Sequence, residues 1–141
     1  MNTRTLISGI VAGIVIFLVG YGIYGIVMAD YFMSAMPSYP GLIKDPMEIW
    51  AIGVGNLIWG ILLAWSLNAA GITSASRGAV YGAIAFFLYT LGTGFMILGQ
   101  LNMNTIESIF VEALCNAILM GIAGAVAGWI LGRNREMKGE R

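Results

Sequence analysis

The chain has 141 residues, of which 59% are hydrophobic and 10% charged, and its mean hydropathy is +0.86. Soluble domains carry about 25% charged residues, so this chain lacks the polar material for a wetted surface. Seven Lys and Arg balance seven Asp and Glu, which excludes the clustered positive charge that nucleic-acid binding requires. The lack of histidine and the single cysteine, Cys115, exclude His-held haem, His-based zinc sites, thiolate clusters and an intramolecular disulfide. This composition indicates an integral membrane protein.

Four apolar stretches follow one another along the chain, at residues 6–29, 46–68, 78–99 and 105–131. Each has about the 20 residues that a helix needs to cross about 30 Å of hydrocarbon, and a helix satisfies its own backbone groups in lipid. The first stretch is too long for the apolar region of a secretion signal, and no small-x-small cleavage site follows it. We therefore predict an all-α, polytopic membrane protein, a four-transmembrane-helix bundle that forms a single domain over residues 1–141.

Local signals predict where these helices begin and end. Residues 45–48, Asp-Pro-Met-Glu, place an acceptor at the N-cap, proline at the first helical position and a carboxylate in the first turn. Residues 104–107, Asn-Thr-Ile-Glu, repeat this pattern, with Asn104 at the N-cap and Glu107 at the third helical position, as in a capping box. Gly132 is expected to close the last helix, and residues 133–141 to form a short, solvated, basic tail.

The distribution of basic residues predicts the orientation. Arg4, Arg77 and four Lys and Arg in the tail fall on one side of the predicted membrane, whereas Lys44 alone falls on the other. By the positive-inside rule, both termini face the cytoplasm (N-in/C-in) of a bacterial cytoplasmic membrane. Trp50 lies near the outer boundary and Trp65 and Trp129 near the inner one, as interfacial anchors do. Tyr31, Phe32, Met33 and Met36, in the apolar outer segment, are expected to lie on the membrane surface or to cover the bundle mouth.

The helices are rich in glycine, and several glycines recur at four-residue spacing, as in the ranges 9–13, 78–82 and 124–128. Small residues at this spacing let membrane helices approach closely. They either pack the helices of one chain together or provide a face for a second copy or for another membrane protein. We therefore expect a non-enzymatic assembly or accessory protein that packs through its glycine-rich helix faces.

A second expectation comes from polar residues inside the spans. Glu112 is the one charged residue well inside a predicted span, about 10 Å along its helix, and such residues are candidate functional sites. The other spans carry polar groups at a similar depth in the outer half of the bilayer, so the candidate cluster is Glu112, Asn116, Asn56, Thr90, Thr93, Tyr21 and Tyr24.

Two interpretations of this cluster remain open. In the first, the Glu112 carboxyl stays neutral in its apolar surroundings and donates a hydrogen bond to Asn56 or a tyrosine, which joins helices. In the second, the cluster binds a proton, a cation or a small solute, and the protein is a small oligomeric transporter or channel.

No catalytic constellation is present, because no Ser or Cys lies beside an activating base and the glycine clusters lack the setting of a phosphate loop. The nine methionines show no repeated spacing of the kind expected for Cu(I). We therefore expect no enzyme activity, no cofactor and no metal. The expected partners are the lipid bilayer and, through the glycine faces, a homo-oligomer or another membrane protein, with no nucleic acid.

Three short segments carry a resemblance to a known family. These are residues 20–25, Gly-Tyr-Gly-Ile-Tyr-Gly, residues 55–60, Gly-Asn-Leu-Ile-Trp-Gly, and residues 128–132, Gly-Trp-Ile-Leu-Gly. In this order the chain resembles small four-helix bacterial membrane proteins grouped as a domain of unknown function. The resemblance implies a fold and a membrane location, and it supplies no catalytic residues. Small multidrug exporters also have four helices, but their essential glutamate lies in the first helix, where this chain has none.

Overall fold

The computed structural model describes residues 2–139, with side chains described as far as Arg133. Its elements are α1 (Thr3–Gly22), the π-helical segment η1 (Ile23–Val27), α2 (Ala29–Ala35), α3 (Ile49–Ala69), α4 (Ala75–Gln100) and α5 (Ile106–Gly139). This described part contains no strand, which confirms the predicted all-α class. Four segments are long and apolar enough to cross a membrane: Thr3–Val27, Ile49–Ala69, Ala75–Gln100 and Ile106–Arg133. They are called the spans below.

The first span starts earlier and ends earlier than predicted. Asn2 caps α1, because its Oδ1 accepts hydrogen bonds from the backbone N–H of Thr5 at 2.9 Å and from the Thr5 hydroxyl at 2.7 Å. At the other end the Met28 N–H donates to the Ile23 carbonyl five residues back, at 2.8 Å, which widens the last turn into η1. The regular helix therefore ends at Gly22 rather than continuing to residue 29.

The predicted start of the second span is wrong. α3 begins at Ile49, not at residue 46, and Asp45 does not cap it. Glu48 precedes the helix with a non-helical backbone, and its carboxylate pairs with the Lys44 ammonium at 2.6 Å. The Ile49 N–H donates to the Met47 carbonyl at 3.0 Å, so this stretch is a turn.

The start of α5 differs from the prediction by one residue. Thr105, not Asn104, is the cap: the Ser108 N–H donates to the Thr105 hydroxyl at 3.1 Å, and the Thr105 N–H donates to the Ser108 hydroxyl at 2.9 Å. These reciprocal bonds form a capping box. Ser108 therefore takes the place that the sequence suggested for Glu107, whose carboxylate is free to bind elsewhere.

The predicted end of α5 is also wrong. The helix continues through Gly132 to Gly139, so the expected solvated tail is helical over its described part, and residues 140 and 141 lie outside the described residues. Gly132 serves packing rather than termination, since a Cβ at this position would overlap the Thr73 carbonyl oxygen of the α3–α4 loop. That loop turns at Gly71, whose φ of +67° favours glycine, and α4 follows from Ala75.

The glycine motifs pack helices in pairs within this one chain. In the α1–α3 pair, a Cβ on Gly9 would come within 2.7 Å of the Ile61 Cα, and a Cβ on Gly13 within 2.7 Å of the Leu57 Cα. In the α4–α5 pair, added Cβ atoms on Gly78 and Gly124 would overlap each other's carbonyl oxygens. Both pairs therefore bring backbone against backbone, and only glycine permits this approach.

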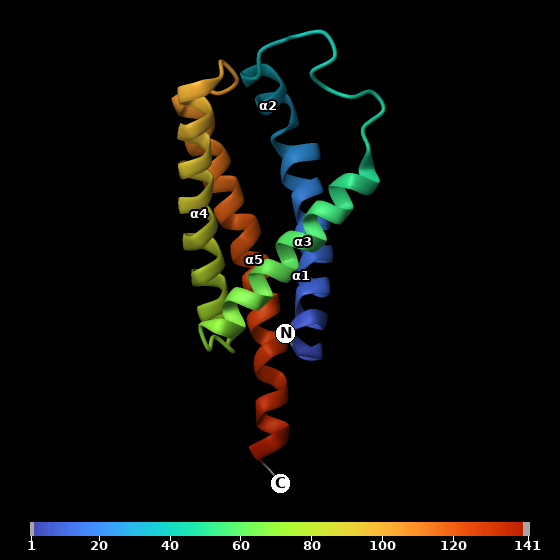
Figure 1. Ribbon diagram of the computed structural model, residues 1–141, viewed down its shortest axis with the longest axis vertical. Coiled ribbons are helices and arrows are strands. Elements are labelled where there is room, and N and C mark those ends of the chain that lie inside the picture. The colour runs from blue at the N-terminus through green and yellow to red at the C-terminus, as the bar shows by residue number, and fades with distance from the viewer. Residues whose placement is uncertain (1, 140–141) are drawn as a thin grey trace.

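The two pairs are joined through α1 and α5, and they are joined more closely at one end of the molecule than at the other. The chain termini lie at the closed end, which we call the terminal end, where the Ser8 hydroxyl of α1 donates to the Ala127 carbonyl of α5 at 3.1 Å (Figure 1). Leu63 and Leu67 of α3 are fully buried there. At the opposite, loop end, which carries α2, α3 leans away from α4 (Figure 1). The chain therefore opens toward the loop end.

Candidate functional site

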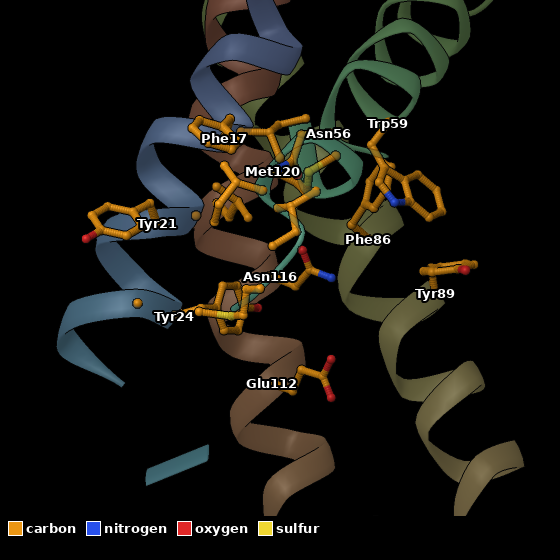
Figure 2. A pocket seen from close by; sticks show the side chains of 17 residues that line it. Phe17, Tyr21, Tyr24, Asn56, Trp59, Phe86, Tyr89, Glu112, Asn116 and Met120 are labelled. Atoms are coloured by element: carbon orange, nitrogen blue, oxygen red, sulfur yellow. The ribbon is translucent and has the colours of Figure 1, made fainter. Parts of the chain in front are cut away.

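A cavity of about 650 Å³ occupies this opening in the loop half of the molecule. Side chains from α1, η1, α3, α4 and α5 line it, together with Met47 from the segment before α3 (Figure 2). Its lining includes Tyr21, Tyr24, Asn56, Glu112 and Asn116, five of the seven residues of the predicted polar cluster. Residues that are distant in sequence but lie at similar depth on separate helices thus meet at one site.

Glu112, in the second turn of α5, is half-buried. Its carboxylate extends from the helix on the same side as the Asn116 amide, toward α4 (Figure 2). The expected hydrogen bond to Asn56 or to a tyrosine is not formed, and within the described residues the carboxylate has neither a hydrogen-bond donor nor a cationic partner. Glu112 is thus the one residue among Asp, Glu, Lys and Arg in the cavity lining.

The interhelical hydrogen bond expected of Glu112 is made instead by Asn116. Its amide Nδ2 donates to the hydroxyl of Thr90 at 2.7 Å and so ties α5 to α4. Thr90 is buried, with 4% of its surface exposed, and it does not line the cavity. The side-chain oxygen Oδ1 of Asn116 makes no hydrogen bond to the described part of the chain, so it remains available as an acceptor.

The other predicted residues take different positions. Asn56 contributes a half-buried amide from α3, and the ring of Tyr24 packs against Phe32 at a centroid distance of 5.3 Å. Tyr21 lines the cavity only with part of its ring, because 64% of the residue is exposed and its hydroxyl points away from Glu112 (Figure 2). Thr93 does not reach the cavity, since its hydroxyl donates to carbonyls of its own helix, Tyr89 at 3.0 Å and Thr90 at 3.2 Å.

The sequence reasoning missed an aromatic wall. Trp59 of α3 lies 5.5 Å from Phe86 and 5.3 Å from Tyr89 of α4, ring centroid to ring centroid, in edge-to-face arrangements. These rings bridge helices that otherwise hardly meet, and all three line the cavity (Figure 2). A signal was present, because Trp59 follows Asn56 by three residues, and Phe86 precedes Thr90 by four. Both pairs therefore share a helix face with a predicted polar residue.

The α2 helix closes one side of the loop end. The Tyr31 hydroxyl donates to the Glu107 carboxylate at 3.3 Å and so links α2 to the first turn of α5. Partial desolvation, followed by the negative charge of Glu107, raises the pKa of Tyr31 above its ordinary value. The ring of Phe32 packs against the ring of Tyr24, whereas Met33 is 65% exposed and faces outward. Glu107 therefore acts in a tertiary contact rather than as the helix cap that the sequence predicted.

Comparison of the chain with protein-family models, with curated proteins and with solved structures found no match. The resemblance to the four-helix family therefore contributes no residue assignment to this site. The assignment depends on the residues themselves, which combine one carboxylate, two amides and several aromatic faces in a half-open cavity within a protein that has four membrane-spanning candidates. Such a lining offers acceptors and π faces but no cationic group, and it suits a cation rather than an anion.

Proposed function

We propose that this protein is a small transporter or channel that binds a monovalent cation in the cavity beside Glu112. We further propose that it spans the bacterial cytoplasmic membrane as a four-helix bundle with both termini in the cytoplasm. The positive-inside rule supports this orientation, since Arg4, Arg77 and Arg133 belong to the terminal end and Lys44 to the loop end. In this orientation the cavity opens toward the outside of the cell.

The observation that carries the proposal is the carboxylate without a partner. A charged residue within a span costs about 3 kcal/mol on insertion scales, so a side chain of this kind is a candidate for a functional role. The structural role, a bond between helices, is filled by Asn116 and Thr90. Glu112 is therefore free for a ligand, and the cavity gives that ligand space.

Ion-driven currents in reconstituted vesicles test the proposal. We expect concentration jumps of monovalent cations to produce a current with the wild-type protein, and Glu112→Gln to reduce that current at least about tenfold, because the counter-charge is lost while the shape is kept. Glu107→Gln is the matched control, since Glu107 lies on the same helix but does not line the cavity. The proposal is wrong if no cation among H⁺, Na⁺, K⁺ and small ammonium ions gives a current, or if both variants behave alike.

Assembly with a second copy or with another membrane protein is the second candidate function. It is supported by two glycines of α4, Gly92 and Gly99, where an added Cβ would meet nothing within 4 Å. They lie seven residues apart and so on one helix face, open to an approaching helix. The mass of the protein complex extracted from native membranes distinguishes this function, which requires more than one chain, from a site complete in a single chain.

A further inference from the structure

The charge of the cavity lining determines the class of ligand first. Glu112 is the one acidic residue in the lining, and neither Lys nor Arg belongs to it. The nearest described basic side chains are at the two ends of the spans, where Lys44 is already paired with Glu48 at 2.6 Å. An ionised Glu112 is therefore compensated only by a cation that enters the cavity.

A divalent metal ion does not fit this set of groups. Ca²⁺ takes six to eight oxygen ligands, and Mg²⁺ requires near-octahedral geometry. Within the described residues, no three His, Cys, Asp or Glu side chains come together. One carboxylate and the amide oxygens of Asn56 and Asn116 leave most coordination positions of such an ion to water in a mainly apolar cavity. A cation that needs few ligands is favoured.

The aromatic wall points to an organic cation. Trp59, Phe86 and Tyr89 lie within 6.2 Å of one another, ring centroid to ring centroid. In Figure 2 the carboxylate of Glu112 extends toward the side of the cavity that these rings occupy. Ammonium groups interact with aromatic faces within about 6 Å of the ring centroid, and most strongly with Trp. A carboxylate and aromatic rings in one cavity are the two attractions that such a group combines.

The volume and the remaining lining indicate what the ammonium group carries. Small-molecule sites usually have volumes of about 300–1,000 Å³, and this cavity, at about 650 Å³, falls in that range. Ile16, Ile52, Leu119 and Met120 make much of its wall apolar. An unsubstituted NH₄⁺ ion would leave this apolar surface in contact with water, whereas an ammonium group with an apolar substituent would bury it.

We propose that the cavity binds a small organic monocation, an ammonium group bearing an apolar substituent, with the Glu112 carboxylate as its counter-ion and the ring of Trp59 beside it. This inference rests on the proposed function of the same site and specifies its ligand class. The ammonium group belongs either to a free solute or to the headgroup of a lipid such as phosphatidylethanolamine. The chemistry of recognition is the same for both sources.

Binding of benzyltrimethylammonium tests the proposal, with neopentylbenzene as its uncharged isostere. The full chain is placed in nanodiscs of phosphatidylglycerol, which has no ammonium group, and binding is measured by equilibrium dialysis against empty discs. We expect saturable binding of the cation and at least about tenfold weaker binding of the isostere, because the isostere keeps the shape and loses the charge. Equal binding of the two probes, or no saturable binding of the cation, would overturn the proposal.

Variants assign the binding to the named residues. Glu112→Gln is expected to weaken cation binding at least about tenfold, and Trp59→Leu several-fold. Glu107→Gln and Trp65→Leu are the matched controls, because both residues lie outside the cavity lining and should leave binding unchanged. Unchanged binding in folded Glu112→Gln protein would contradict the proposal. If that variant fails to fold, the comparison of the cation with its isostere on the wild-type protein still tests whether the site requires a positive charge.

The lipid identifies the source of the ammonium group. Weaker probe binding by the wild-type protein in phosphatidylethanolamine discs than in phosphatidylglycerol discs supports the site and assigns it to a headgroup, whereas equal probe binding in both lipids supports a free solute. The binding measurements and the current measurement can fail independently of each other. Currents with Na⁺ or H⁺ but no probe binding would support the proposed function and overturn this inference. Probe binding without any current would support the binding site for an organic cation and overturn the transport function.

Discussion

Asn116 and Glu112 lie one helical turn apart on α5, yet only one of them is used by the packing of the chain. Asn116 donates to the buried Thr90 hydroxyl at 2.7 Å, whereas the Glu112 carboxylate has no partner among the described side chains. Thr93, one turn from Thr90 on the exposed side, bonds only to its own helix. Asn116 thus pairs two helices and Thr93 bonds to its own backbone, whereas Glu112 remains free for the ligand that we propose.

A double-mutant cycle between Asn116→Leu and Thr90→Val tests this division. We expect a coupling energy of about 0.6 kcal/mol, the average for a hydrogen bond between membrane helices, because each single substitution removes the same bond. The measurement is the free energy of reversible unfolding in mixed detergent micelles. Thr93→Val replaces Thr90→Val in the control cycle and should show no coupling to Asn116→Leu. Equal coupling in both cycles would contradict the assignment.

At this scale the sequence indicated the depth of each polar group but not its partner. Residue counts along the helices placed Glu112, Asn116 and Thr90 at one level, and the structure brings all three to the same region. Which of them bond depends on how far each helix is rotated about its own axis and on side-chain rotamers. Neither can be calculated from spacing alone. For that reason the sequence does not reveal that Asn116, rather than Glu112, makes the bond between helices.

At the scale of elements, glycine spacing predicted close helix packing but not which helices pair. The motif of residues 78–82 in α4 meets that of residues 124–128 in α5, and the motif of residues 9–13 in α1 meets the single glycine Gly60 in α3. Any of these faces has the same spacing, so the sequence left both pairing within the chain and pairing between chains open. Most helix ends were predicted to within a few residues. The predicted end of α5 failed where Gly132 packs against Thr73, and the predicted start of α3 failed where Glu48 pairs locally with Lys44.

Alanine substitutions separate the glycines that hold helices together from those that do not. In Gly82→Ala the new Cβ would overlap the Met120 carbonyl oxygen of α5. We expect the free energy of unfolding of this variant to be about 1–3 kcal/mol lower than that of the wild type, because the site is overpacked. Gly92→Ala is the matched control on the same helix, where nothing lies within 4 Å. It should be neutral or more stable, because Ala favours a helix over Gly by about 1 kcal/mol. Equal losses for both variants would refute the α4–α5 contact.

At the scale of the whole molecule, the cavity follows from unequal packing of the four spans. α1 pairs with α3 and α4 pairs with α5, and the two pairs meet through α1 and α5 at the terminal end (Figure 1). α3 therefore diverges from α4 toward the loop end, and Trp59 reaches across the gap to Phe86. No single helix carries a pattern that predicts this opening. It arises only when two glycine-packed pairs are joined at one end.

The orientation of this opening can be tested with introduced cysteines in a Cys115→Ser background. Ser38 and Ser76 are exposed and lie toward opposite ends of the spans, Ser38 in the α2–α3 segment and Ser76 in the first turn of α4 beside Arg77. Arg4, Arg77 and Arg133 lie at the terminal end and Lys44 at the loop end, so the positive-inside rule predicts that Ser76 faces the cytoplasm. A membrane-impermeant maleimide should therefore label Ser38→Cys in intact cells and Ser76→Cys only after the cells are permeabilised. Labelling in the reverse order would turn the cavity toward the cytoplasm, and a cation would then enter it from inside the cell.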